Sequence, residues 1–348
     1  MHTETSSYLA SCRQLVVQGI QDLVPQDTPY GPALYDLVLD YPLRQAKALR
    51  PALAIATCRA HGGRLAEVAP TATVLELYHS AFLVHDDIED DSEQRRGQPT
   101  LHREHGVPIA INVGDAMLAM ALDPLLDNVR VVGLARALRI LREVSSMARL
   151  SAEGQAVELD WIRHGRWALE DADYVEMVVR KTAWYTFITP ITVGALVAGV
   201  DGGRLATLRT FGEHLGIAFQ VQDDVLNLTA SSGYGKERSG DLWEGKRTLI
   251  LLHALRSASP TERTEALRIL GLARPGSVGQ GPGKTGEEVD WLRSLIDQTD
   301  SLVHARRIAL DHAHIAQRIL EGLLDGLPPS AHGRFLASIV SFVVDRDW

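Results

Sequence analysis

Residues 73–91 read "TVLELYHSAFLVHDDIEDD", an apolar stretch that ends in a run of acidic side chains. The apolar residues recur at three- and four-residue spacing, which predicts a buried helix. Because a helix turns by about 100° per residue, His79, Asp86 and Asp90 lie on one face, with Asp87 at its edge. The stretch therefore predicts a core helix that presents several carboxylates at its end.

The acidic run continues into "SEQRRGQPTLH" at residues 92–102, so a pair of arginines, Arg95 and Arg96, follows it directly. Like charges this close repel one another unless a positive group lies between them. Oxygen-rich clusters suit Mg²⁺, which takes few protein ligands and leaves room for substrate phosphates. Taken alone, however, such a run is more often a solvated acidic turn than a metal site.

Helical spacing recurs along nearly the whole chain, whereas the alternation typical of strands is almost absent. It predicts helices over residues 67–91, 107–126, 131–148, 150–163, 171–199, 203–229, 246–258, 262–271, 287–296, 299–322 and 330–345. Breaks rich in Gly, Ser or Pro fall at 95–100, 230–241 and 274–288, and the last is predicted to be a surface loop. The sequence thus predicts an all-α fold, with residues 1–348 forming a single domain.

The bulk composition excludes several classes of protein. With 348 residues and 45% hydrophobic content, the chain is long enough to bury a sizeable core. A net charge of −9, without a basic run, argues against nucleic acid as a partner. Two cysteines without metal-type spacing fit a reducing compartment, and no uninterrupted apolar run reaches about 18 residues. We expect a cytoplasmic protein that does not span a membrane.

A second acidic run, "AFQVQDDVLNL" at residues 218–228, makes the metal interpretation stronger. It places Gln220, Asp223, Asp224 and Asn227 at positions i, i+3, i+4 and i+7, which share one helix face. Two such faces across a cavity are able to hold several Mg²⁺ ions around a diphosphate. Basic residues that suit phosphate binding accompany both runs: Lys47, Arg50, Arg95, Arg96, Lys236 and Lys246.

The order and spacing of these motifs resemble those of a known family. The chain carries "KALRPAL", "DDIEDDSEQRRGQPTLH", "GQAVELDW", "VRKT", "FQVQDDVLNL" and "GKERSGDLWEGKRT" in this order. Over roughly residues 30–320 it is similar to the trans-isoprenyl diphosphate synthases, and most similar to their geranylgeranyl diphosphate synthase branch. The resemblance implies a large helical bundle around a central cavity. It also implies a Mg²⁺-dependent condensation of isopentenyl diphosphate with an allylic diphosphate.

The resemblance also implies roles for individual residues. The Mg²⁺ ligands are Asp86, Asp87, Asp90, Asp223, Asp224 and Asn227. The residues that bind the allylic diphosphate are Arg95, Lys181, Lys236 and Lys246, and those that bind isopentenyl diphosphate without metal are Lys47, Arg50, His79 and Arg96. Thr182 and Gln220 line the reaction centre. One departure is that Gln45 and Ala46 precede Lys47, where the family usually has glycines.

Two other functions stay open. A class I terpene cyclase ionises the same kind of substrate, but it carries an Asn/Ser/Glu triplet that the second run lacks, and it does not need Lys47, Arg50 and Arg96. A non-catalytic subunit of a heteromeric prenyl synthase is expected to lose metal ligands, whereas this chain keeps both sets. We therefore favour an active prenyl transferase.

Helix geometry also predicts the product length, and the resemblance implies how the chain assembles. Phe82 lies one turn, about 6 Å, below Asp86 on the same face, so it is expected beside the growing chain. Its neighbour Ala81 is small, and together they predict products of C15 to C20, with C20 favoured by the resemblance. The alternative is that Phe82 packs into a neighbouring helix and never contacts the product. A homodimer is implied by the resemblance, and the apolar residues 110–126 offer a surface for it.

Overall fold

The computed structural model describes residues 2–229, 239–274 and 283–344, and helices make up most of this part of the chain. In chain order the helices are α1 (His2–Leu23), the π-helix η1 (Gly31–Tyr35), α2 (Asp36–Leu43), α3 (Leu49–Ala60), α4 (Leu65–Glu89), α5 (Leu101–His105), α6 (Val107–Met120), α7 (Leu122–Val132), α8 (Leu134–Arg163), α9 (Asp171–Val178), the π-helix η2 (Val179–Ile188), α10 (Thr189–Val197), α11 (Gly202–Thr229), α12 (Gly240–Glu244), α13 (Leu249–Ser257), α14 (Pro260–Leu270), α15 (Gly286–Gln298), α16 (Ser301–Leu324) and α17 (Ala331–Val344). The predicted all-α fold is confirmed.

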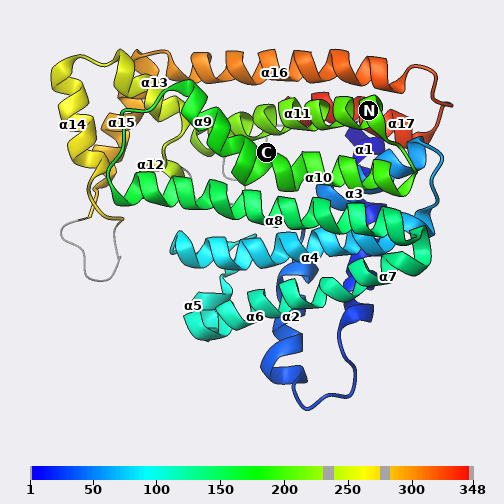
Figure 1. The fold of residues 1–348 in the computed structure, drawn as a ribbon. Helices are drawn as coiled ribbons and strands as arrows, with labels where there is room; N and C mark the ends of the chain where they lie inside the picture. Colours follow the sequence, from blue (N-terminus) through cyan, green and yellow to red (C-terminus); the bar gives the residue numbers. More distant parts are fainter. Residues whose placement is uncertain (1, 230–238, 275–282, 345–348) are drawn as a thin grey trace.

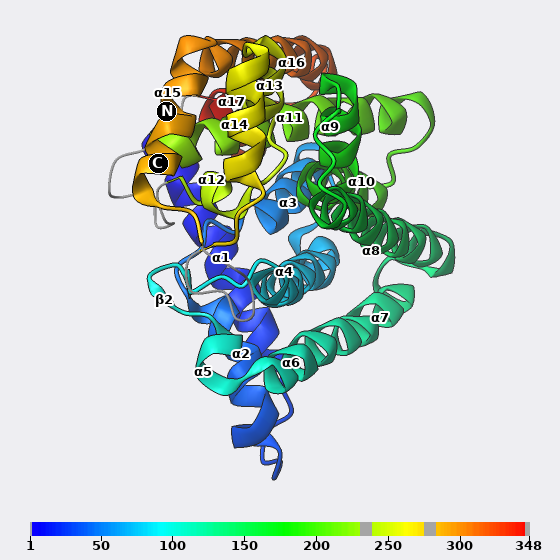
Figure 2. The ribbon, with the colours of Figure 1, turned by 90° about the vertical axis from the view of Figure 1, so that its left-hand side faces the viewer.

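The long helices lie in successive layers (Figure 1). Helix α16 runs along one side of the molecule, followed by α11, α10, α8 and then α4, while α6 and α7 lie beyond α4. Helices α13, α14 and α15 gather at one end of this stack. Viewed from that end, α6 and α7 form an arm below α4 that leads up to α8 (Figure 2). This layering brings the C-terminal end of α4 close to η2 and to Lys246, which follows α12.

Helix α4 contains residues 73–89 and lies in the core. Side chains from every part of its surface are buried, among them Leu75, Leu77 and Val84. A helix that is apolar nearly all round is typical of the interior of a large domain. Its first turn begins at Leu65 and its last residue is Glu89, so the predicted helix over 67–91 agrees within two residues at each end.

The break predicted at residues 95–100 is a short β-hairpin. Strands β1 (Gln94–Arg95) and β2 (Gln98–Pro99) pair antiparallel around Arg96 and Gly97, which both have positive φ angles, of 56° and 76°. Two central residues with positive φ are the signature of a type I′ turn, for which Gly is favoured. Arg44 fixes the hairpin by donating hydrogen bonds to the carbonyls of Arg95 and Pro99, at 3.1 and 2.8 Å. The hairpin therefore sets the positions of both arginines.

The helical boundaries differ from the sequence prediction in several places: α1, α2 and α3 lie outside the predicted ranges, and the helix predicted over 107–126 is broken at Ala121. Residues 134–163 form the single helix α8, although the periodicity predicts two helices, over 131–148 and 150–163. Residues 171–197 are helical throughout but widen into a π-helix at η2. Two glycines let neighbouring helices approach this segment: a Cβ at Gly154 in α8 would collide with the Lys181 backbone, and one at Gly216 in α11 with Ala183. Close approach from both sides holds η2 in place.

Helices α6 and α7 expose several large apolar side chains. The run Val107–Val132 is long and apolar enough to cross a membrane by length and composition, but it is broken at Ala121, and its buried residues pack against α4. The core helix of a protein that does not cross a membrane has the same length and composition, so these two properties do not establish a membrane span. Its outward side chains include Ile109, Leu122 and Leu126, which are 43%, 48% and 59% exposed.

Candidate active site

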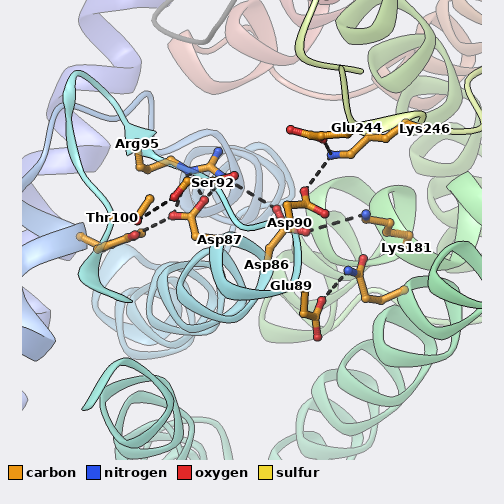
Figure 3. Close-up of polar contacts among 12 residues, drawn as sticks. Asp86, Asp87, Glu89, Asp90, Ser92, Arg95, Thr100, Lys181, Glu244 and Lys246 are labelled. Atoms are coloured by element: carbon orange, nitrogen blue, oxygen red, sulfur yellow. Dashed lines mark hydrogen bonds and ion pairs between the residues drawn. The ribbon is translucent and has the colours of Figure 1, made fainter. Parts of the chain in front are cut away.

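The first acidic motif ends α4 among three cations from other segments (Figure 3). Asp90 Oδ2 accepts a hydrogen bond from Lys246 Nζ at 2.8 Å. Asp86 lies between Lys181 and Arg95, with its carboxylate oxygens 3.8 Å from Lys181 Nζ and 3.7 Å from Arg95 Nη2. The structure thus brings together Asp86, Asp90, Arg95, Lys181 and Lys246, all of which were predicted site residues.

The two carboxylates of this motif titrate differently. Partial burial and the like charge of Asp90 raise the pKa of Asp86 above its usual value, although Lys181 and Lys246 oppose this shift. For Asp90, burial also acts upward, but the contacts with Lys246 and Lys181 outweigh it and lower its pKa. Two acids so close to each other are stabilised in the charged form only by added positive charge. The site accordingly has the electrostatic character of a cation-binding site.

Asp87 lies apart from Asp86 and Asp90. Its side chain is fully buried, accepts a hydrogen bond from Tyr41 Oη at 2.6 Å, and pairs with Arg95, whose Nε lies 2.9 Å from Oδ1. Figure 3 shows it turned toward Arg95 and away from Lys181 and Lys246. In this arrangement Asp87 orients Arg95. Its predicted role as a metal ligand stays a prediction.

The second acidic motif borders a small polar cavity of about 80 Å³ near the end of α11. Asp223, Asp224 and Asn227 line it together with Lys181 and Lys246. The two lysines that contact the first motif therefore face the second as well. The two acidic motifs thus share these two lysines.

Asp224 repeats the environment of Asp87. It is buried and accepts hydrogen bonds from Tyr174 Oη at 2.6 Å and from Gln220 Nε2 at 2.8 Å. Burial, followed by the charge of Asp241, raises the pKa of Asp224 to about 8. Gln220 in turn accepts from Thr182 Oγ1 at 2.9 Å, so the two predicted reaction-centre residues form one hydrogen-bond chain with Asp224. In each motif, then, the second aspartate is held by a tyrosine from another helix.

Asn227 also has a structural contact. Its Oδ1 accepts a hydrogen bond from the backbone N–H of Asp241 at 3.2 Å, at the start of α12. Asp241 itself lines the polar cavity and was missed by the sequence argument. Lys236, predicted to bind the allylic diphosphate, lies outside the described residues.

Two acidic residues that pair with the site lysines were also missed. Glu158 forms an ion pair with Lys181, and Glu244 lies 3.0 Å from Lys246 Nζ. Burial acts to lower the pKa of Lys181, but the negative charges of Glu158 and Asp86 outweigh burial, so the pKa of Lys181 is raised. The pKa of Lys246 is raised in the same way by Asp90 and Glu244. Both lysines are therefore charged. Glu158 belongs to the motif "GQAVELDW" at residues 154–161, which was quoted only for the family resemblance. The presence of an acidic residue in that motif is the sequence signal that was overlooked.

A second basic group lies deeper, where α3 meets α4 and η2. Arg50 and His79 are each 9% exposed, and the charges of Arg50 and Arg96 both act on His79. Burial and then these arginines lower the pKa of His79 well below its usual value, so the ring is neutral near neutral pH. Arg50 Nε and His79 Nδ1 are buried and have no hydrogen-bond partner in the described part of the chain. Buried polar atoms without partners suggest that a polar ligand belongs here.

Arg96 and Lys47, also predicted to bind isopentenyl diphosphate, have contacts with other segments. Arg96 Nη1 donates to the Tyr41 carbonyl at 3.3 Å from the tip of the hairpin. Lys47 lies with its Nζ 5.7 Å from the centre of the Phe342 ring in α17. One buried acid, Glu76, lies within the field of Arg50 and Arg96, and burial raises its pKa despite them. Glu76 was not predicted as a site residue.

The donor chemistry of this site fits Mg²⁺. Within residues 2–229, 239–274 and 283–344, no three His, Cys, Asp or Glu side chains form a ready ligand cluster. Asp86 instead contacts Lys181, and Asp90 contacts Lys246, so the two lysines supply the compensating charge. Carboxylate oxygens in excess at a polar cavity are the ligands that Mg²⁺ prefers.

The predicted chain-length residues lie directly below the first motif. Ala81 is fully buried. Phe82 is half-buried and packs edge-on against two tyrosine rings, Tyr185 at 5.6 Å and Tyr78 at 6.0 Å between centroids. Phe82 therefore belongs to an aromatic cluster on the site side of α4.

Comparisons with known proteins agree with this geometry. The sequence profile of the polyprenyl synthetase family matches residues 32–280. The chain is 33% identical over 303 residues to the short chain isoprenyl diphosphate synthase of Methanothermobacter thermautotrophicus, covering 86% of each protein. It is 31% identical to the octaprenyl diphosphate synthase of Haemophilus influenzae, covering 87% of this chain and 85% of that protein.

Solved structures share the fold over nearly the whole chain. The geranylgeranyl pyrophosphate synthetase of Pyrococcus horikoshii is 30% identical with a TM-score of 0.84, covering 98% of both chains. The geranylgeranyl pyrophosphate synthase of Corynebacterium glutamicum, solved with isoprenyl diphosphate and magnesium, is 25% identical with a TM-score of 0.83. The match covers 98% of this chain and 99% of that one. The relatives' names include both short-chain and octaprenyl synthases, so they do not fix a product length.

Proposed function

The chain belongs to the polyprenyl synthetase family and is a trans-prenyltransferase, and from this premise we propose that it condenses isopentenyl diphosphate with an allylic diphosphate in a Mg²⁺-dependent reaction. The observation that carries the proposal is the pair of acidic helix ends around Lys181 and Lys246. Both lysines are charged and border the polar cavity, and each contacts an aspartate of the first motif.

The allylic diphosphate binds in this cavity. Lys181, Lys246 and Arg95 contact its oxygens. These contacts replace part of the ion pairs that the three cations now form with the first acidic motif. Bound Mg²⁺ would be held by Asp86, Asp90 and Asp223 and would supply further positive charge to the departing diphosphate. For Asp87 and Asp224 we favour a positioning role, because a tyrosine hydroxyl already engages each of them.

The reaction begins with cleavage of the allylic carbon–oxygen bond, which transfers the bonding electrons to the diphosphate. Lys181 and Lys246 stabilise this developing negative charge, and such selective stabilisation of the transition state accelerates the step. The resulting carbocation is attacked by the double bond of isopentenyl diphosphate. The new cation then loses a proton to the released diphosphate, which restores a double bond.

The second substrate is held by the deeper basic group. Arg50 and Arg96 bind its diphosphate by charge-assisted hydrogen bonds, and Lys47 adds a third positive charge. His79 is neutral, so it acts as a hydrogen-bond donor and contributes no charge. Anchoring both diphosphates aligns the two reacting carbons and makes the encounter effectively intramolecular.

The test is product analysis of the purified protein with an allylic diphosphate and Mg²⁺, with and without isopentenyl diphosphate. We expect longer prenyl diphosphates only when isopentenyl diphosphate is present. Cyclic hydrocarbons formed without it would instead identify a terpene cyclase. No product in either reaction, from a folded protein, would favour a non-catalytic subunit.

Product length is the next prediction, and we expect C15 to C20 diphosphates with C20 favoured. Replacing Phe82 by Ala is expected to lengthen the product by one or more isoprene units, because it removes a ring just below the first motif. Since Phe82 is only half-buried, the loss of stability should be below the roughly 3–5 kcal/mol typical of a fully buried Phe. The measurement is the chain-length distribution of the products.

Val84 provides the matched control for Phe82. It is buried in the same helix, but it lies about 160° around the helix from Asp86 and so faces away from the site. Val84→Ala should leave the chain-length distribution unchanged. If Phe82→Ala also leaves it unchanged, Phe82 does not limit the product, and the packing alternative holds.

We also expect a homodimer. The surface predicted at residues 110–126 continues in the structure to α8, where Leu134 and Leu138 are 61% and 51% exposed. Light scattering at micromolar concentration should give about twice the 38.1 kDa mass of the chain. Leu126→Asp combined with Leu134→Asp should give monomers, whereas Val303→Asp, at an exposed apolar position on α16, should not. A wild-type monomer would contradict the prediction.

A further inference from the structure

Arg50 is held by two consecutive residues of η2. Its Nη2 donates a hydrogen bond to Thr186 Oγ1 at 2.8 Å, and its guanidinium carbon lies 4.2 Å from the centre of the Tyr185 ring. Thr186 is fully buried, and Arg50 is 9% exposed. The Tyr185 ring therefore fixes the plane of the guanidinium, and the Thr186 hydroxyl fixes one of its edges.

Such a clamp matters because an arginine side chain is long. A free arginine loses rotamer entropy when it is fixed in one orientation. The attraction between a cation and an aromatic ring strengthens when water is excluded, as it is at this depth. Thr186 accepts from only one of the five guanidinium N–H groups, so the others are available to a bound anion. An arginine fixed before the ligand arrives binds it with a smaller entropic penalty.

The clamp also has a defined place between the two substrate pockets. The Tyr185 ring lies 6.0 Å from His79 and packs edge-on against Phe82 at 5.6 Å. Four residues earlier in η2, Lys181 contacts Asp86 and Glu158. One π-helical segment thus touches the cavity assigned to the allylic diphosphate and the group assigned to isopentenyl diphosphate.

The position of this segment is set by backbone packing. The Cα of Gly154 in α8 faces the Lys181 backbone, and Gly216 in α11 faces Ala183, with no space for a Cβ at either place. A wider π-turn held in this way is often found at functional sites. Tyr185 and Thr186 therefore present a rigid surface to Arg50.

We propose that Tyr185 and Thr186 are positioning residues for isopentenyl diphosphate, which act by holding Arg50 in the orientation that binds the diphosphate. The proposal rests on the assignment of Arg50 to that substrate. Tyr185 supplies an aromatic face and Thr186 an acceptor oxygen. Neither residue contacts the diphosphate itself.

The test compares three variants in two assays. In steady-state kinetics, Tyr185→Leu should raise the KM for isopentenyl diphosphate by about 5- to 20-fold, and Thr186→Val by about 3- to 10-fold. The KM for the allylic substrate and kcat should each change by less than about 3-fold. Tyr185→Phe keeps the ring and should restore an affinity within about 2-fold of wild type. Calorimetric titration of isopentenyl diphosphate in EDTA should show the same order without metal or turnover.

Arg50→Ala, measured in parallel, separates this proposal from the proposed function. If Arg50→Ala weakens isopentenyl diphosphate binding but Tyr185→Leu and Thr186→Val do not, the clamp is wrong and the pocket stands. If Tyr185→Leu raises both KM values equally, or Tyr185→Phe fails to restore affinity, the positioning role is also wrong. If Arg50→Ala itself has no effect on binding, the pocket assignment fails and the clamp with it.

Discussion

Asp86→Ala and Asp223→Ala are each expected to lower kcat by about 100-fold or more while the fold remains intact. Asp86 lies 3.8 Å from Lys181 Nζ, and Asp223 lines the polar cavity together with Lys181 and Lys246. The lost interaction stabilises charge that develops only as the allylic bond breaks, so the loss appears in turnover. The measurement is kcat at saturating Mg²⁺ and substrates, with the melting temperature as the check of folding.

Asp91 offers a control from the same acidic run. Its side chain is 51% exposed and pairs with Arg103 outside the cavity, at 2.8 Å. Its φ angle is 52°, which Asn tolerates better than Ala, so the control is Asp91→Asn. We expect its kcat to stay within about 2-fold of wild type. Near-normal turnover in Asp86→Ala or Asp223→Ala would contradict a site built from both acidic motifs.

The contrast between Asp86 and Asp87 shows what periodicity is able to predict. A rotation of about 100° per residue is enough to place Asp86 and Asp90 on one face and Asp87 at its edge. It carries no information about which side chain from a distant helix meets each face. Tyr41, 46 residues earlier, fixes Asp87, and Tyr174, 50 residues before Asp224, fixes that residue. Such long-range partners follow from the packing of helices, which a single sequence does not reveal.

The π-helix η2 shows a second limit. Its residues have the same apolar spacing as the α-helices around them, so the sequence predicts one uninterrupted helix over 171–199. The wider turn becomes visible only where Gly154 and Gly216 bring α8 and α11 against its backbone. The conformation is thus set by tertiary packing, which overrides local propensity. Because Lys181, Tyr185 and Thr186 all lie on this segment, the prediction missed how the two substrate pockets are linked.

The cationic residues were easier to predict than their partners. Lys246 stands out because a phosphate site needs positive charge near acids, and Lys181 was implied by the family resemblance. Glu158 and Glu244 form ion pairs with these two lysines. The lysines need such counter-ions because burial removes water from their ammonium groups. Burial is not visible in a single sequence, so counter-ions of this kind escape a motif-based argument.

Arg50→Ala is expected to raise the KM for isopentenyl diphosphate by roughly 10- to 100-fold. The estimate follows from the loss of charged hydrogen bonds, each contributing about 1.5–3 kcal/mol, where about 1.4 kcal/mol corresponds to a factor of ten. Arg50 lies with His79 in the deeper basic group, and its Nε has no partner there in the described chain. A ligand oxygen would satisfy that buried donor, so its removal should weaken this substrate selectively.

The selectivity of the effect is what tests the separation of the two pockets. The ion pairs of Lys181, Lys246 and Arg95 with the first acidic motif do not involve Arg50, so the KM for the allylic diphosphate should change by less than about 3-fold. Arg59→Ala is the matched control, because Arg59 lies in the same helix but donates to the Gly63 carbonyl, away from the basic group. It should leave both KM values near wild type. If Arg50→Ala raises both KM values equally, the arginine serves the site as a whole, since a charge that acts on one diphosphate alone has no reason to weaken the other.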